Sequence, residues 1–413
     1  MIKIKKGIPL YDQCDENGYW GKVFGSSYIP ETLFQPLEDL SNAFEKLRKN
    51  KKFLKERDEM YAKFIGRPTP FLKLNNLSKH LGGAQIYAKH EAMANSQSHK
   101  LNNALLHCLI AKYTNKKVVV GDTGAGMAGS GLAMAAAATG LKAIIFQGEK
   151  DYLRQAPNSM RMRLLGAEIN VVKSGSRQLV DAVSESIRYF VANCDKVHLA
   201  VGSSVGPSIY TRICAYAQSV ISKELKKQVQ DEFGRIPKNL SLVAAVGGGS
   251  SSLGFWMHMI DSGCRLIGCE AGGPKKFKNK HAAPLTYGSK LGILHGAAQY
   301  VMQDKNFQIA DTESVSAGLD YPGCSAIHSW LKQQKRATYV APSDEETLEA
   351  FKLCSRLEGI QASLEPSHAL AHVCKIAPKM KKTDKIITLI CGNAMKDFGI
   401  IAEKLGVKIW QTY

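Results

Sequence analysis

Short apolar runs alternate with helix-like stretches between residues 116 and 201. The runs at 116–120, 143–147 and 167–172 are rich in β-branched or other apolar residues and favour strands. An alanine-rich segment after residue 129 and the segments 152–165 and 177–193 have the composition and length of helices. Strands that alternate with helices in this way predict an α/β fold with a parallel sheet.

Two more apolar runs, at 242–246 and 385–389, predict buried strands. The first leads into Gly247–Ser252 and a helix over 253–260, and the second ends at Cys391 and Gly392. Because the carboxyl ends of parallel strands are where α/β sheets place their chemistry, residues that follow these strands are candidates for a functional site.

A lysine stands at the start of another predicted helix. Apolar residues fall on one helical face at Leu101, Ala104, Leu105, Cys108 and Leu109. We expect Ser96 or Ser98 to cap this helix, which puts Lys100 in its first turn. The positive end of the helix dipole and burial both disfavour a charged ammonium there.

An uncharged amine is a nucleophile. Lys100 is therefore a candidate to hold an aldehyde cofactor as a Schiff base, and pyridoxal phosphate is the common case. A lysine near a helix start is more often a solvated surface residue, so the interpretation depends on other segments.

Two glycine-rich turns are the other segments that support a cofactor site. In Gly121–Gly129, backbone N–H groups are expected to converge on an anion such as a substrate carboxylate. Asp122 in this turn is either a general acid or base or an N-cap carboxylate. In Gly247–Ser252, three glycines and three hydroxyl residues favour a phosphate site over a bare flexible turn.

Composition narrows the class of protein. The 413 residues suffice for two domains, and 45% hydrophobic with 22% charged residues is typical of a globular enzyme. The net charge of +19 comes from dispersed lysines without a recognition motif, which argues against nucleic acid. The apolar stretch 127–146 is interrupted at Thr139-Gly140 and Lys142, so we expect no membrane segment. Ten scattered cysteines indicate free thiols in a reducing compartment, hence the cytoplasm.

Taken together, these segments make the chain resemble the tryptophan synthase β subunit family of fold-type II pyridoxal phosphate enzymes. The resemblance runs from about residue 21 to 401. The matching motifs are Gly66-Arg67-Pro68-Thr69, Ser98-His99-Lys100, Thr123-Gly124-Ala125-Gly126, residues 161–168, Ser316-Ala317-Gly318-Leu319-Asp320-Tyr321-Pro322 and residues 364–370.

The resemblance implies two α/β domains with mostly parallel, twisted sheets flanked by helices. The N-terminal domain would span 63–217 and contain a mobile, substrate-closing subdomain at about 115–202. The C-terminal domain, from 1–62 and 218–413, would bind the cofactor phosphate. A homodimer is expected.

The resemblance also assigns roles by position. Lys100 resembles the Schiff-base lysine and His99 its neighbour. The cofactor phosphate would be held by Gly247, Gly248, Gly249, Ser250 and Ser251, with Glu365 and Cys391 near the cofactor ring. The substrate carboxylate would be held by Thr123, Gly124, Ala125, Gly126, Met127 and Ala128.

Two further sets of residues are implied. Asp320 and Arg154 match the pair that meets when the family's active site closes. The carbonyls of Gly247, Tyr321 and Gly323 fall where the family holds a monovalent cation, Na⁺ or K⁺.

The implied reaction is β-replacement on serine through an aminoacrylate, with indole as the family's nucleophile. Asp122 stands for the family's glutamate, Met127-Ala128 for a glutamine and a histidine, and Cys391 for a serine. Val180 replaces a lysine that pairs with the α subunit, which weakens the case for that partner.

Three alternatives stay open. The first is a synthase that uses a nucleophile other than indole. The second is a serine or threonine β-eliminase, and the third is an inert regulatory paralogue. Serine or a serine-like amino acid is the expected first substrate of the enzymatic candidates.

Overall fold

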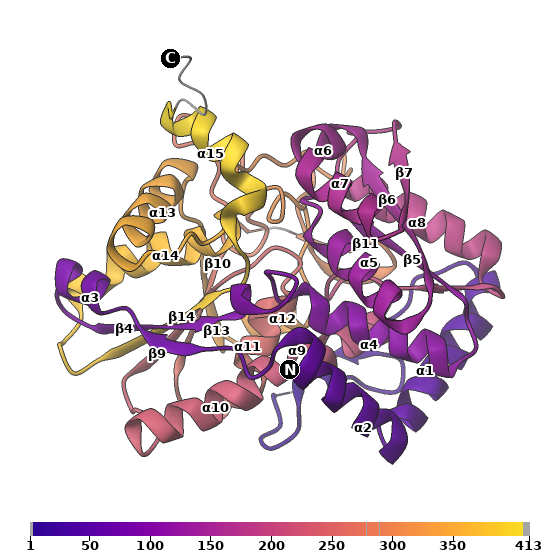
Figure 1. The fold of residues 1–413 in the computed structure, drawn as a ribbon, viewed down its shortest axis with the longest axis horizontal. Coiled ribbons are helices and arrows are strands. Elements are labelled where there is room, and N and C mark those ends of the chain that lie inside the picture. The colour runs from indigo at the N-terminus through magenta and orange to yellow at the C-terminus, as the bar shows by residue number, and fades with distance from the viewer. Residues whose placement is uncertain (1–2, 278, 289, 408–413) are drawn as a thin grey trace.

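The fold rests on three β-sheets and the helices that cover them (Figure 1). This computed structural model describes residues 3–277, 279–288 and 290–407. No helix among these described residues is long and apolar enough to cross a membrane.

The largest sheet has six strands in the order β13-β10-β9-β14-β4-β3. Its strands are β3 (Phe71–Lys73), β4 (Gln85–His90), β9 (Leu240–Ala245), β10 (Arg265–Cys269), β13 (Ala337–Val340) and β14 (Lys385–Ile390). All neighbours are parallel except β3, which runs antiparallel to β4. The predicted strands at 242–246 and 385–389 are β9 and β14, and they lie side by side.

Helices cover both faces of this sheet (Figure 1). One face carries α3 (Asn75–Leu81), α13 (Asp344–Glu358) and α14 (Leu364–Ile376), and the other carries α10 (Val220–Phe233), α11 (Ser250–Trp256) and α12 (Ala326–Gln333). The strands read as continuous apolar runs because both of their faces are buried.

A second sheet is parallel throughout, with the order β7-β6-β5-β8. It comprises β5 (Val118–Thr123), β6 (Lys142–Gly148), β7 (Glu168–Val172) and β8 (Val197–Leu199), with α5 (Met127–Thr139) and α8 (Leu179–Asn193) packed against it. The alternation between residues 116 and 201 therefore predicted a parallel sheet correctly. The predicted helix at 152–165 is divided into α6 (Glu149–Arg154) and α7 (Ala156–Leu164), because Gln155 leaves the helical conformation.

The third sheet is antiparallel and was not predicted. It pairs β1 (Tyr19–Trp20), β2 (Phe24–Gly25), β12 (Ala297–Val301) and β11 (Lys290–Leu294) in that order. Two of its strands have only two residues, too few to show a period in the sequence.

The domain division stays a prediction. Strand β4 pairs with β14 in the large sheet and β3 pairs with β4, although residues 71–90 fall within the expected N-terminal domain. This pairing favours a division in which residues 71–90 go with the large sheet.

Helix α4 (Lys100–Tyr113) lies below β5 in the view of Figure 1, on the side of the second sheet. It is buried from Leu101 to Ala111 and packs on α5 and on α9 (Ser208–Gln218). The predicted serine cap is wrong in detail. His99 precedes the helix without a side-chain cap, and Ser98 Oγ accepts only a long 3.4 Å bond from the backbone N–H of Lys100.

A buried charge cluster anchors the start of α4. Arg67 donates to both carboxylate oxygens of Glu91 at 2.8 Å and to Glu224 at 2.8 and 2.9 Å. Lys89 Nζ donates to Glu224 at 2.7 Å. Burial opposes ionisation of Glu91, but the Arg67 guanidinium outweighs it and lowers the pKa of Glu91 to about 2. The carboxylate of Glu91 therefore stays charged in the interior.

The cluster reaches the helix through two amides. Asn102 Oδ1 accepts from Arg67 at 2.9 Å, and Asn102 Nδ2 donates to Gln218 at 3.0 Å. Gln218 Nε2 in turn donates to the carbonyl of His99 at 3.1 Å. The backbone on both sides of Lys100 is thereby fixed.

Replacing Arg67 tests this anchor. Arg67→Met leaves two carboxylates buried beside one lysine, so we expect the free energy of unfolding to fall by about 3–5 kcal/mol in urea titrations. The exposed pair Lys227–Asp231 is a matched control. Lys227→Met should change the free energy of unfolding by less than about 0.5 kcal/mol. Equal losses in the two variants would contradict the anchoring role.

Candidate active site

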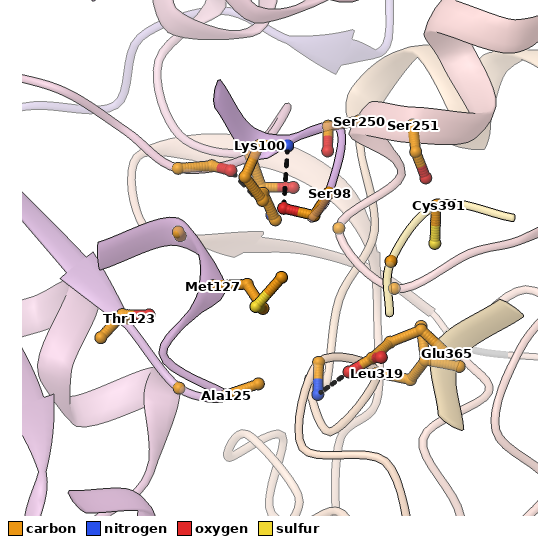
Figure 2. Close-up of a pocket in the computed structure, with 18 of the residues that line it drawn as sticks. Ser98, Lys100, Thr123, Ala125, Met127, Ser250, Ser251, Leu319, Glu365 and Cys391 are labelled. Atoms are coloured by element: carbon orange, nitrogen blue, oxygen red, sulfur yellow. Dashed lines mark hydrogen bonds between the residues drawn. The ribbon is translucent and has the colours of Figure 1, made fainter. Parts of the chain in front are cut away.

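One cavity collects most of the predicted site residues. It lies at the carboxyl ends of strands from both parallel sheets and has a volume of about 110 Å³ (Figure 2). The predicted residues that line it are His99, Lys100, Asp122, Thr123, Gly124, Ala125, Met127, Ala128, Gly247, Gly248, Gly249, Ser250, Ser251, Tyr321, Glu365 and Cys391. Gly126, Arg154, Asp320 and Gly323 are not part of its lining.

Lys100 is half-buried in the cavity wall at the first position of α4. Its Nζ donates to the carbonyl of Gly202 at 2.9 Å. His99 beside it is buried, with Nδ1 3.0 Å from the carbonyl of Cys391 and Nε2 3.2 Å from Ser250 Oγ. Burial and the nearby Lys100 charge lower the pKa of His99 to about 4, so the imidazole is neutral.

Asp122 is buried near the end of β5. Burial raises its pKa to about 6, although the Lys100 charge opposes the shift. Its Oδ1 has no hydrogen-bonding partner among the described residues. The carboxyl group therefore titrates near neutral pH and has a free oxygen, which suits proton transfer.

The turn after β9 brings backbone close to neighbouring side chains. A Cβ on Gly248 would lie 2.4 Å from Ser203 Oγ, and one on Gly249, where φ is +86°, would lie 2.2 Å from His328 Cδ2. At Gly249 the left-handed backbone and the buried His328 ring both require glycine, and at Gly248 the backbone is crowded by Ser203. Ser250 and Ser251 follow at the start of α11, and Figure 2 shows both on the same side of the cavity as Cys391.

On the opposite side of the cavity, Thr123, Ala125 and Met127 lie along one turn (Figure 2). Gly126 turns the backbone in the left-handed region with φ of +81°, and a Cβ there would lie 2.3 Å from Asn158. Helix α5 starts at Met127, whose side chain projects into the middle of the cavity.

Cys391 follows β14 and faces the cavity. Burial and the Glu365 carboxylate raise the pKa of its thiol to about 12. The thiol is therefore uncharged at neutral pH.

Lys396 is a site residue that the sequence did not single out. Its ammonium is buried at the cavity wall and donates to Glu365 at 2.9 Å and to Asp397 at 2.6 Å. Burial opposes the ionisation of Glu365, but Lys396 outweighs it and lowers the pKa of Glu365 to about 2. Glu365 also accepts from the backbone N–H of Gly318 at 3.1 Å, as Figure 2 shows. No local pattern indicated this role, because Glu365 lies 31 residues from Lys396 in the chain.

Asp320 and Arg154 lie together outside the cavity lining. Arg154 is 2.6 Å from Asp151 on its own helix but 3.5 Å from Asp320 Oδ2. Asp320 also accepts from Gln178 at 3.1 Å. Burial raises the pKa of Asp320 to about 6.

The remaining predicted positions are near these elements. Gly247 follows β9 at the cavity, and Tyr321 and Gly323 lie in the loop before α12. Within the described part of the chain, no cluster of His, Cys, Asp or Glu side chains suits a metal ion. The cation site at three backbone carbonyls stays a prediction. Val180 is half-buried in the first turn of α8.

Comparison with known proteins identifies relatives over nearly the whole chain. Residues 63–392 match the family described as pyridoxal-phosphate dependent enzyme. The tryptophan synthase beta chain of Acinetobacter baylyi is 41% identical over 396 residues, which cover 96% of this chain and 97% of the relative. That of Allorhizobium ampelinum is 44% identical over 394 residues, covering 95% and 96%.

A solved structure shares the fold. It is the O-acetylserine dependent cystathionine beta-synthase of Helicobacter pylori, with a TM-score of 0.59 and 19% sequence identity. The match covers 81% of this chain and 95% of that chain.

Removing the buried ammonium at the cavity wall should make stability depend on pH. In Lys396→Met, Glu365 and Asp397 lack their cation, so burial alone acts on them and raises their pKa values. The folded state then binds more protons than the unfolded chain, and stability rises as pH falls. We expect a loss of about 3–5 kcal/mol at pH 7 and a smaller loss at pH 5 in urea titrations, with Lys396→Arg as control. A loss that is the same at both pH values would refute the role of Lys396.

Proposed function

Because the chain belongs to the tryptophan synthase beta chain family of pyridoxal-phosphate-dependent enzymes, we propose that it catalyses β-replacement on serine or a serine-like amino acid. The observation that carries the proposal is a single cavity in which Lys100, Asp122 and the glycine turn at 247–249 meet. The nucleophile that adds to carbon β is indole or a related compound.

The residues of the cavity fit pyridoxal phosphate. Lys100 offers an amine for the aldehyde, and the crowded glycines at 248 and 249 let backbone N–H groups approach a phosphate. Ser250 and Ser251 add hydroxyl donors beside that turn. When bound, the cofactor supplies an aldehyde for covalent attachment and a conjugated ring that withdraws electrons from carbon α of the amino acid.

Lys100 and Asp122 divide the proton transfers. Lys100, held on the Gly202 carbonyl, takes the proton from carbon α and later returns one. Asp122, with a pKa raised to about 6 by burial, is mostly ionised at neutral pH and takes the proton that the nucleophile loses. Its side chain is one methylene shorter than the family's glutamate, so the nucleophile must approach more closely or be larger.

Cys391 and Glu365 set the charge around the cofactor ring. The thiol of Cys391, whose pKa burial raises to about 12, gives no negative charge that would keep a ring nitrogen protonated. Glu365 is ionised but neutralised by Lys396. A neutral ring is a weaker electron sink, which favours β-elimination and β-replacement over transamination or racemisation.

We also propose that residues 115–202 move when substrate binds. Arg154 holds Asp151 closely and Asp320 at 3.5 Å, so a small shift would exchange one partner for the other. Closure would exclude water from the cavity. A homodimer is proposed as the working assembly, and Val180 gives no charge with which an α subunit could pair.

Absorbance spectroscopy of the holoenzyme tests the proposal. Serine, O-phosphoserine, O-acetylserine and threonine are each added with and without indole, and products are identified by mass spectrometry. We expect a new absorbance band with at least one of the first three, and its decay with formation of a β-substituted amino acid when indole is present. Lys100→Ala should lose both responses. Steady release of pyruvate without a nucleophile would indicate an eliminase instead, and no response with any amino acid would indicate an inert paralogue.

The pH profile tests the role of Asp122. As a base it must be ionised, so kcat should rise with pH through about 6 and then level off. Asp122→Asn should lower kcat by about 10²–10⁴-fold. Asp320 also has a pKa raised to about 6, so Asp320→Asn is the control that should keep the acid limb. An unchanged limb in Asp122→Asn would remove Asp122 from the mechanism.

A further inference from the structure

A second, much smaller chamber lies behind Lys100. Its volume is about 10 Å³, close to what one water molecule requires. It shares Lys100, Asp122, Ala128 and Gly202 with the main cavity. Its other walls are Asn103, Ala104, Leu132 and Ala200.

Two residues of these walls each have a buried oxygen that lacks a hydrogen-bonding partner among the described residues. The two oxygens are Oδ1 of Asn103 and Oδ1 of Asp122, and both side chains are more than nine-tenths buried. The Asn103 amide cannot turn round freely, because its Nδ2 donates to the carbonyl of Val201 at 2.8 Å. A buried oxygen without a hydrogen bond is energetically costly, so two in the walls of one chamber indicate a bound donor.

We consider one donor that bonds both oxygens, because the two residues line the same chamber. An amide oxygen and an ionised carboxylate are acceptors only, so they cannot bond each other. Lys100 Nζ lies in the same wall and already donates to Gly202 at 2.9 Å. A water molecule has two protons for the two oxygens and lone pairs for a third group, which matches this set of partners.

We propose that the chamber binds one water molecule between Asn103 and Asp122, and that this water carries a proton from Asp122 to Lys100. The inference rests on the proposed function. It makes Asn103 a positioning residue, since it holds the water and does not touch the reacting atoms.

The proton balance of β-replacement requires such a path. The nucleophile leaves a proton on Asp122, whereas carbon α of the product takes its proton from Lys100, which has given its own to the leaving group. In the relay, the O–H bond of Asp122 breaks as an O–H bond forms on the water. Another O–H bond of the water breaks as an N–H bond forms on Lys100. Asp122 is left as a carboxylate and Lys100 as an ammonium, ready for the next steps.

Two variants remove the water by different means. Ala200→Val fills the chamber and leaves Asn103, Asp122 and Lys100 in place. Asn103→Leu removes the amide oxygen and keeps the number and branching of the side-chain heavy atoms. Ala135→Val is the matched control, because Ala135 is fully buried in α5 but does not line the chamber.

Crystal structures and pH titrations of the four holoenzymes test the proposal. We expect ordered density within hydrogen-bonding distance of both oxygens in the wild type and in Ala135→Val, and none in the other two.

The pH titration follows the cofactor. Without the water, the ionised form of Asp122 is less stable relative to the protonated form, so Asp122 stabilises a positive charge on the Lys100 nitrogen less well. The absorbance change of the bound cofactor should then move to lower pH by about one unit. Lys100 and Tyr321 are the titratable groups whose charges act on Asp122, and Tyr321 stays a neutral phenol because burial raises its pKa.

Kinetics separate this proposal from the proposed function. We expect kcat to fall about tenfold in Ala200→Val and Asn103→Leu with KM for the amino acid nearly unchanged, because the relay acts after binding. Absence of the water in the wild type, or identical pH profiles in all four proteins, would overturn the relay. If the wild type forms no β-replacement product, the proposed function fails, while the density and the absorbance titration still decide whether the water binds and acts on Lys100.

Discussion

The position of one amine depends on a cluster of ion pairs next to the helix that carries it. Arg67, Lys89, Glu91 and Glu224 neutralise one another inside the protein, and their hydrogen bonds lead through Asn102 and Gln218 to the backbone around Lys100. Buried ions are costly alone, so the four side chains have essentially one acceptable arrangement. That arrangement fixes where α4 begins and therefore where its first side chain points.

Burial also acts on the ionisable groups around the cavity, but several of them have no partner of opposite charge. His99, Asp122 and Cys391 have no strong ion partner, and burial shifts each towards its uncharged form. Glu365 and Lys396 are also largely removed from solvent but form an ion pair, so both keep their charges. Pairing therefore decides which buried groups keep their charge and which are shifted towards the neutral form.

The parallel sheets and most of the cavity could be predicted from the sequence, because both follow from local rules. Strand and helix periods fix the layers, and glycine-rich turns at strand ends indicate where ligands approach. The antiparallel sheet escaped prediction because its two-residue strands have no period. Lys396, Asn103 and the Arg67 cluster escaped because their importance comes from partners distant in sequence, such as Glu224 for Arg67. The serine cap failed because the backbone of His99, tied to Gln218, already enters the helical conformation.

The side chain of Met127 affects how the shape of the cavity can change during evolution. Its side chain is an unbranched thioether that lies in the middle of the cavity. The turn before it is set by the left-handed backbone of Gly126, not by the Met127 side chain. Such a side chain adapts its shape to its neighbours at little cost. Selection can therefore reshape the space offered to an incoming molecule by changing this one position, without disturbing the lysine or the turn opposite it. New substrate preferences in this lineage would be reached through single steps that each leave a folded, working protein.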